Sequence, residues 1–142
     1  MHKARALLGA AAASLLTTAF LVPASPALAG PNCASGYHCG WDIGFDTGKI
    51  SFFNGDRDFR DNRFHTGVIV DNNIKTVSNS SSSNYVSHWY TEVNWEGYAF
   101  CVNPGSWVGS LPDDGIPGNG VGFANEASSV RLEAGGPYDW CY

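Results

Sequence analysis

Short runs of aromatic and β-branched residues, separated by glycines, constrain the fold of this chain more than any other feature. In the last run, the apolar Val130 and Leu132 alternate with polar residues, which is the period-two pattern of a strand with one buried face. No window repeats apolar residues every 3.6 positions over the length of a helix. The sequence therefore predicts an all-β sandwich or barrel. The runs cover residues 37–43, 49–53, 67–70, 85–93, 97–102 and 128–133.

Recurring glycines and asparagines divide this pattern into two similar halves. Phe45 lies shortly before Gly48 in the first half, and Trp95 lies shortly before Gly97 in the second. Farther along, each half contains an Asn-x-x-x-[Ser/Thr]-Val segment, at residues 72–77 and 125–130. A glycine at a folded hairpin can adopt a positive φ, and a nearby aromatic ring can pack across the corner. We therefore expect two Greek keys that form one sandwich; chance similarity between two β segments is the alternative.

Length and composition limit the classes of protein to which the chain can belong. Its 142 residues leave room for one domain, and 13% aromatic with 15% charged residues is not the composition of a disordered tail. A formal charge of −5 disfavours nucleic acid and anionic membrane surfaces, which attract clustered Lys and Arg. We expect a monomeric domain that binds neither nucleic acid nor membrane.

The first 29 residues have the features of a signal peptide. Lys3 and Arg5 form a basic head, an Ala- and Leu-rich run comes next, and residues 27–29 read Ala-Leu-Ala, the small-residue pattern that signal peptidase cleaves. Prolines interrupt the end of the run, which makes it a poor membrane-spanning helix. We expect cleavage after Ala29, secretion, and a single mature domain of residues 30–142.

All four cysteines, Cys33, Cys39, Cys101 and Cys141, lie after the expected cleavage site. An even number of cysteines in an oxidising compartment indicates two disulfides, for which three pairings exist. We favour Cys33–Cys39, because Gly36 lets the short loop close, and Cys101–Cys141, which would fasten the end of the chain to its middle. The spacing lacks the tight Cys-x-x-Cys pattern of zinc sites, so we expect no metal at the cysteines.

Several motifs carry a resemblance to a known family. They are the aromatic residue before a glycine at each corner, the Asn-Pro-Gly at 103–105 followed by Val108 and Leu111, and the Asn-Glu-Ala-Ser-Ser-Val segment at 125–130. With the cysteine layout, they resemble the βγ-crystallin fold and, more narrowly, secreted bacterial peptidase inhibitors of the Streptomyces metalloproteinase inhibitor type. The resemblance implies a disulfide-linked sandwich of two Greek keys that blocks thermolysin-like zinc metalloendopeptidases.

The resemblance also implies an inhibitory loop made of Cys101, Val102, Asn103, Pro104 and Gly105. The position that matches the reactive bond of the inhibitor is Cys101–Val102. Val102 would fill the apolar pocket that such an enzyme offers just after the cleaved bond, and the Cys101 carbonyl would face the zinc ion of the enzyme. A bridge from Cys101 to the last cysteine would hold the segment in place, and Pro104-Gly105 suits the centre of a type II turn.

Strand register offers an alternative explanation of the same residues. Tyr98, Phe100 and Val102 would share one face of a strand. If that face belongs to the core, an interior valine and a structural disulfide explain the segment without a protease.

Calcium binding is a second function for a domain of this fold. βγ-crystallin domains can hold calcium with an [Asn/Asp]-[Asn/Asp]-x-x-[Ser/Thr]-Ser segment, whose oxygen atoms suit a hard cation. In residues 71–76, Lys75 stands where the ligand hydroxyl belongs, and in residues 124–129, Ala124 replaces the first acid or amide. Asp56-x-Asp58 begins like another calcium loop, but it lacks the glycine and the final glutamate of such a loop. We expect weak calcium binding at most, and no cofactor.

Catalytic motifs are missing from the sequence. It contains no H-E-x-x-H, G-x-S-x-G or G-x-x-x-x-G-K-[ST], and His38, His65 and His88 have no catalytic spacing. We expect a protein that is not an enzyme.

Five tryptophans leave a third class open, a module that binds wall polysaccharide or acts as a small toxin. Exposed tryptophans can stack on sugar rings, whereas buried ones only fill the core. Trp41, Trp89 and Trp95 lie in or beside the strand patterns and are expected in the core. Trp107 and Trp140 are the candidates for exposure.

Overall fold

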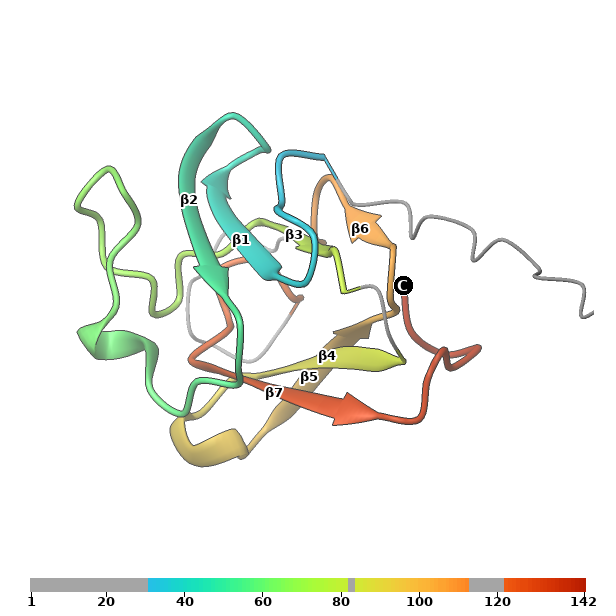
Figure 1. Ribbon diagram of the computed structural model, residues 1–142. Helices are drawn as coiled ribbons and strands as arrows, with labels where there is room; N and C mark the ends of the chain where they lie inside the picture. Colours follow the sequence, from blue (N-terminus) through green and yellow to red (C-terminus); the bar gives the residue numbers. More distant parts are fainter. Residues whose placement is uncertain (1–30, 82–83, 113–121) are drawn as a thin grey trace, which may run out of the picture.

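The computed structural model describes residues 31–81, 84–112 and 122–142. The predicted signal peptide, with its cleavage site after Ala29, lies outside the described residues. Within these ranges the chain forms two antiparallel sheets, ordered β2-β1-β3-β6 and β5-β4-β7 (Figure 1). The elements are β1 (His38–Ile43), β2 (Thr47–Phe52), η1 (Phe59–Asp61), β3 (Thr76–Asn79), β4 (Tyr85–Tyr90), η2 (Val93–Trp95), β5 (Tyr98–Val102), β6 (Trp107–Val108) and β7 (Ser129–Ala134).

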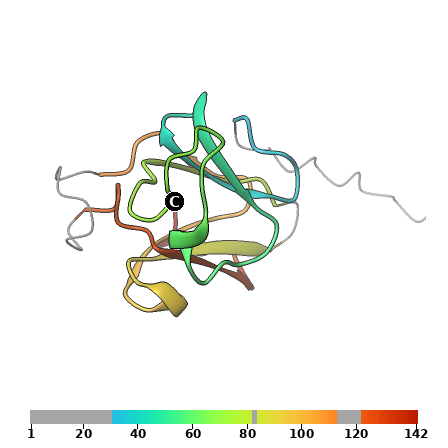
Figure 2. The same ribbon diagram turned by 90° about the vertical axis from the view of Figure 1, so that its left-hand side faces the viewer.

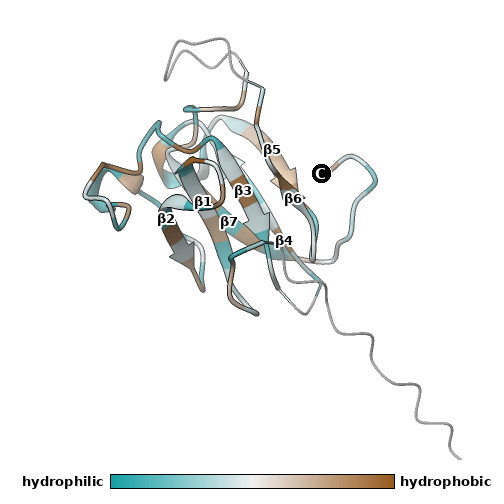
Figure 3. Cartoon of the chain, turned by 90° about the horizontal axis from the view of Figure 1, so that it is seen from above, coloured by the Kyte–Doolittle hydropathy of each residue, from teal (hydrophilic) through white to brown (hydrophobic). Residues whose placement is uncertain are grey.

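The two sheets form two layers, seen from two directions in Figures 1 and 2. Aromatic rings fill the space between them: Phe52 stacks on Phe59 at 5.0 Å between ring centroids, and Trp89 stacks on Phe100 at 5.9 Å. Hydropathy changes from residue to residue along the strands, as expected when one face of each sheet packs on a core (Figure 3). This confirms the all-β sandwich predicted from the sequence.

The two halves exchange short segments, as two interlocked Greek keys do. β6 belongs to the second half but pairs with β3 of the first, through Val77 and Val108. In the opposite direction, Asp56 of the first half forms an isolated bridge with Val130 of β7. Each sheet therefore contains backbone from both halves.

The predicted corners have the expected backbone conformations. Gly48 and Gly97 have φ values of 59° and 62°, and a Cβ at either position would collide with a side chain of the preceding strand or turn. Asn72 and Asn125, at the start of the repeated segments, also have positive φ values, 53° and 59°. The internal repeat is thus a repeat of backbone conformation.

Two differences from the predicted strands have physical causes. Residues 67–70 form part of a hairpin loop, in which Gly67 has a φ of 90° and Ile69 bridges Arg63, because no neighbouring strand extends the pairing. The sequence does not predict β3 or β6, since β3 is buried but largely polar and β6 has only two residues. No helix in the described ranges is long and apolar enough to cross a membrane.

Both predicted disulfides form. Cys33 precedes β1 and Cys39 lies in it, and the bond between them, with Cα atoms 5.9 Å apart, closes the short loop that leads into this strand. Cys101 of β5 bonds to Cys141, with Cα atoms 4.9 Å apart, across a sequence separation of 40 residues.

Candidate functional site

The residues of the predicted reactive bond are buried, contrary to the interpretation in which Val102 is presented to an enzyme. Val102 is 0% exposed and Cys101 is 1% exposed, and both lie in β5 opposite β4. The backbone of this segment is also engaged on its other side, because the Cys101 carbonyl accepts a hydrogen bond of 3.1 Å from the Tyr142 N–H. The prediction that Val102 fills a protease pocket is therefore wrong for this conformation. Strand register gave the correct alternative, since Val102 belongs to the core.

The turn after β5 is at the surface and has the predicted geometry. Ser106 N–H donates to the Asn103 carbonyl at 3.1 Å, and Gly105, at the third position of the turn, has a φ of 77°, which is typical of a type II turn. Pro104 occupies the second position. All of these turn residues are half-buried. The turn therefore does not project Val102 outward, but is itself the accessible part of the predicted loop.

Asn103 connects this turn to the end of the chain. Its Nδ2 donates to the Tyr138 carbonyl at 2.9 Å and to the Cys141 carbonyl at 3.3 Å, while its Oδ1 accepts from the Tyr138 N–H at 2.8 Å. A further backbone bond joins Asn103 N–H to the Tyr142 carbonyl at 2.8 Å. Together with the Cys101–Cys141 disulfide, one side chain thus fixes residues 138–142 beside the turn.

Aromatic side chains cover the outside of this region. Trp140 is 64% exposed, Tyr98 49% and Tyr142 43%. The Trp140 ring stacks on Tyr138 at 5.3 Å with an interplanar angle of 14°, and also contacts Tyr98 at 6.1 Å. We call residues 103–105 and 138–142, together with Tyr98, the C-terminal surface. Sequence reasoning named Trp140 as a candidate for exposure but missed the surrounding tyrosines, although the Pro-Tyr-Asp-Trp-Cys-Tyr ending was the signal for them.

Two rings of this region, those of Tyr98 and His88, carry no charge near pH 7. Burial, and secondarily the neighbouring Tyr90, raises the pKa of Tyr98 to about 12. Burial also lowers the pKa of His88, whose ring lies 5.9 Å from that of Trp140, although the Glu133 carboxylate acts in the opposite direction. The Trp140 ring is therefore in contact with a neutral imidazole and a neutral phenol.

The two calcium-type segments lie next to each other across the repeat. Asn72 N–H donates to the Ala127 carbonyl at 3.0 Å, and Asn125 N–H donates to the Ile74 carbonyl at 2.8 Å. The Thr76 hydroxyl is already used, because it donates to the Gly109 carbonyl at 3.1 Å. No group of three or more His, Cys, Asp or Glu side chains that could hold a metal ion occurs among residues 31–81, 84–112 and 122–142.

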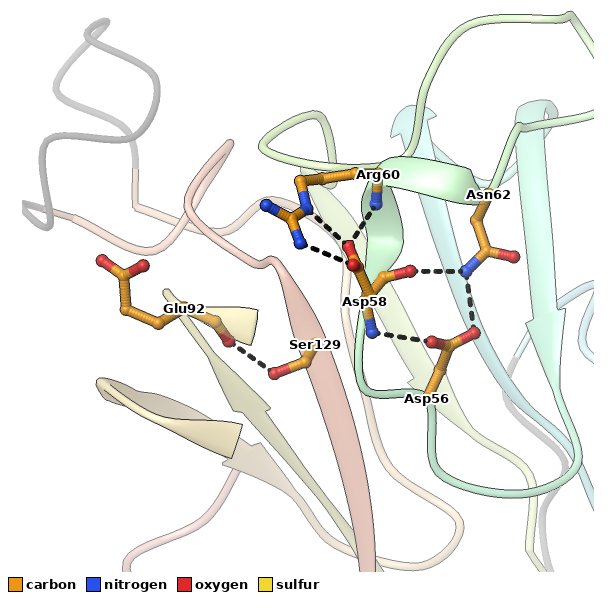
Figure 4. Close-up of polar contacts among 6 residues, drawn as sticks. All are labelled: Asp56, Asp58, Arg60, Asn62, Glu92 and Ser129. Atoms are coloured by element: carbon orange, nitrogen blue, oxygen red, sulfur yellow. Dashed lines mark hydrogen bonds and ion pairs between the residues drawn. The ribbon is translucent and has the colours of Figure 1, made fainter. Parts of the chain in front are cut away.

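The carboxylates of the Asp56-x-Asp58 segment organise their own loop (Figure 4). Asp56 accepts from the Asp58 N–H at 2.9 Å and from Asn62 Nδ2 at 2.7 Å. Asp58 caps η1 through the Arg60 N–H and pairs with the Arg60 guanidinium at 2.6 Å, and these hydrogen bonds lower the pKa of Asp58 to about 2. The figure also shows Ser129 Oγ donating to the Glu92 carbonyl, which ties η2 to β7. The acidic residues here have local partners, as a solvated loop requires.

The tryptophans do not gather in one groove. Trp41 and Trp89 are buried, as predicted. Trp95 is half-buried rather than in the core, because its Nε1 donates to the Asp56 and Val130 carbonyls and Arg57 covers its ring at 4.2 Å. Trp107, 47% exposed, lies in β6, whereas Trp140 belongs to the C-terminal surface.

Comparison with known proteins decides the family. The model of peptidase inhibitor family I36 matches residues 27–102, which is more than half of the chain. The chain belongs to peptidase inhibitor family I36. Membership of this family gives it the role of a protease inhibitor, with a protease as its partner, rather than that of an enzyme. The match ends at Val102, so the turn and the C-terminal segment lie beyond it.

A solved structure supports the fold assignment independently. It is described by the words "Evolution of the eye lens beta-gamma-crystallin domain fold" and superposes with a TM-score of 0.56 at 15% sequence identity. The superposition covers 75% of this chain and 94% of the solved chain. At this identity the likeness shows the fold alone, which is that of a βγ-crystallin domain. No curated protein matches the chain.

Proposed function

We propose that this family I36 protein is secreted and inhibits a thermolysin-like zinc metalloendopeptidase, which it contacts through the C-terminal surface. The resemblance to the Streptomyces metalloproteinase inhibitor supports the target class. The observation that carries the choice of surface is that exposed aromatic side chains are held rigidly there by a disulfide and by the Asn103 hydrogen bonds. Tryptophan and tyrosine at such a rigid surface are the residues that most often dominate binding energy.

The proposed contact differs from a presented substrate bond. Asn103, Pro104 and Gly105 are half-buried and remain the accessible part of the inhibitory loop, whereas Cys101 and Val102 support it from the core. Thermolysin-like enzymes accept apolar side chains beside the cleaved bond, and among the described residues Trp140 is the most exposed aromatic side chain available for such a pocket. Because the segment is already ordered, binding loses little conformational entropy.

Titration of thermolysin with the mature protein tests this proposal. We expect stoichiometric loss of peptidase activity. Trp140→Ala should weaken inhibition at least tenfold, which corresponds to about 1.4 kcal/mol, because an anchor residue is lost. Trp107→Ala is the matched control: it removes an equally large exposed ring outside the C-terminal surface and should leave inhibition unchanged.

Two results would contradict the proposal in different ways. No inhibition at a large molar excess would exclude this target class, while the family role would stand. A cut at Cys101–Val102, found by mass spectrometry of the complex, would mean that β5 opens and that this bond is the reactive one after all.

Secretion is tested separately. If the predicted cleavage is correct, N-terminal sequencing of the exported protein should give Gly30 as the first residue.

A further inference from the structure

A second feature of the molecule is a cavity of about 470 Å³ at one end of the sandwich. Both sheets contribute to its wall, through His38 on β1, Tyr85 on β4 and Leu132 on β7. The segments before β1 and after β2 and β3 complete it. None of its described lining residues belongs to the C-terminal surface. Its size is in the range of cavities that hold small molecules.

The lining of this cavity is neutral. Its described lining residues include no Asp, Glu, Lys or Arg. His38, only 1% exposed, is the least accessible of them, and burial lowers its pKa to about 4, so the imidazole is uncharged near pH 7. A charged ligand would lose its hydration without gaining a counter-charge, so the cavity favours a neutral one.

The polar group at the base of the cavity lacks a hydrogen bond. His38 Nδ1 is buried and has no partner in the described part of the chain. A buried nitrogen without a hydrogen bond destabilises a folded protein, and in a native structure it calls for an explanation. A hydroxyl group can donate or accept, so it can pair with imidazole whichever nitrogen carries the proton.

Exposed aromatic rings form the rim. Phe53 is 63% exposed and Tyr85 47% exposed, and the Phe53 ring is supported by Tyr37 at 5.4 Å. A ligand that suits this site combines a flat apolar face for the rim with hydroxyl groups for the base. A pyranose ring has this combination.

We infer that the cavity binds one neutral pyranose ring, the terminal residue of an oligosaccharide, with a hydroxyl on the His38 imidazole and the ring face against Phe53 or Tyr85. This is a function beyond protease inhibition. It would let the protein bind a glycan through one end of the sandwich while the C-terminal surface stays free.

Nuclear magnetic resonance titration of the mature protein with chitotriose, cellotriose and mannotriose tests the inference. We expect at least one of them to shift the His38 and Tyr85 ring resonances saturably. Tyr85→Ser should weaken that binding at least fivefold. Tyr98→Ser is the matched control, because Tyr98 is 49% exposed against 47% for Tyr85 but lies outside the cavity, and it should bind the sugar like the parent protein.

The polar part of the site is tested by a second pair of variants. His38→Gln keeps a hydrogen-bonding group and should retain part of the affinity, whereas His38→Phe should abolish binding while the domain stays folded by circular dichroism. The inference is overturned if none of the three sugars gives a saturable shift up to about 20 mM. This concentration is far above a dissociation constant of about 1 mM, so even weak binding would be detected. It is equally overturned if Tyr85→Ser and Phe53→Ser bind as tightly as the parent protein.

Discussion

The two halves of this sandwich use the same backbone devices with different side chains. In the first half, the corner aromatic Phe45 packs edge-on against Trp41 at 5.1 Å, beside the Cys33–Cys39 disulfide. In the second half, the corner aromatic Trp95 instead donates hydrogen bonds to two backbone carbonyls, one from each half. The corner of the first half is thus a local cluster, whereas the corner of the second joins the halves.

The halves differ most in the loop length that each disulfide closes and in the segment that follows β7 in the second half. The first disulfide spans a sequence separation of 6 residues and the second one of 40. Only the second half carries an extra segment, residues 138–142, which the repeat does not require. The repeated parts of the chain build the fold, and the part without a counterpart adds Tyr138, Trp140 and Tyr142 to the C-terminal surface.

The largest expected effect separates the two disulfides. Replacing Cys101 and Cys141 by serine should cost about 4 kcal/mol of unfolding free energy, against about 2 kcal/mol for Cys33 and Cys39, because a longer loop restricts the unfolded chain more. Urea unfolding of both double variants measures this. Equal losses would mean that native contacts at the bridges, rather than loop length, determine their contribution.

A second prediction concerns the buried histidine of the first half. The pKa of His38 is lowered to about 4 in the folded state, so below its unfolded value the unfolded chain binds the proton first. Stability is therefore fully present above about pH 6.5 and should fall by about 3 kcal/mol as the pH drops to about 4.

Measurement of the unfolding free energy as a function of pH tests this prediction. His38→Gln should remove most of the dependence of the unfolding free energy on pH. His88 of the second half, whose pKa is also lowered, serves as the comparison, because the Glu133 carboxylate beside it opposes the effect of burial. If the pH dependence of the unfolding free energy remains in His38→Gln but disappears in His88→Gln, the acid sensitivity comes from His88 in the second half instead.

The third prediction distinguishes two roles of Val102 in the second half, packing in the core and contact with the protease. Val102→Ala should lower the unfolding free energy by about 2 kcal/mol through a core cavity, yet leave inhibition by the folded protein unchanged. Val108→Ala, at a half-buried position, should cost less than about 1 kcal/mol. If Val102→Ala loses more inhibition than its smaller folded fraction explains, Val102 contacts the protease after all.

The smallest expected effect is that of calcium on either half. Lys75 and Ala124 stand where the two segments would need ligands, so calorimetric titration should be weak or silent and the melting temperature should rise by less than about 1 °C. A clear rise would identify a calcium site, and Asn125→Ala and Asn72→Ala would then show which half holds the ion.

The sequence allowed the fold to be predicted because its constraints are local. A positive φ at Gly48 or Gly97 depends on the residue itself, and Gly36 lies inside the short loop that it helps to close. The favoured disulfide pairing, the Pro104-Gly105 turn and the two Greek keys depended on such features and are confirmed. β6 was missed because two residues carry no detectable pattern.

The candidate site depended on contacts that are distant in the sequence. Period-two alternation places Val102 on the same face as Phe100, but it does not say whether that face is covered. The answer lies in β4 and in the bond from Tyr142 to the Cys101 carbonyl, across about forty residues of chain. The Asn103 side chain likewise reaches Tyr138, 35 residues away, and no local pattern indicates such a contact.

The reciprocal pairing of β6 with β3 and of Asp56 with Val130 limits how this molecule can be divided. A fragment with only β1 to β3 would leave the outer edge of β3 open, and a fragment with only β4 to β7 would leave β6 without its partner strand and remove the bridge from Asp56 to β7. Open strand edges attract further strands, so either fragment would associate with the other or with copies of itself. The duplication can be recognised in the sequence, yet only the intact chain supplies both the β3–β6 pairing and the Asp56–Val130 bridge by itself.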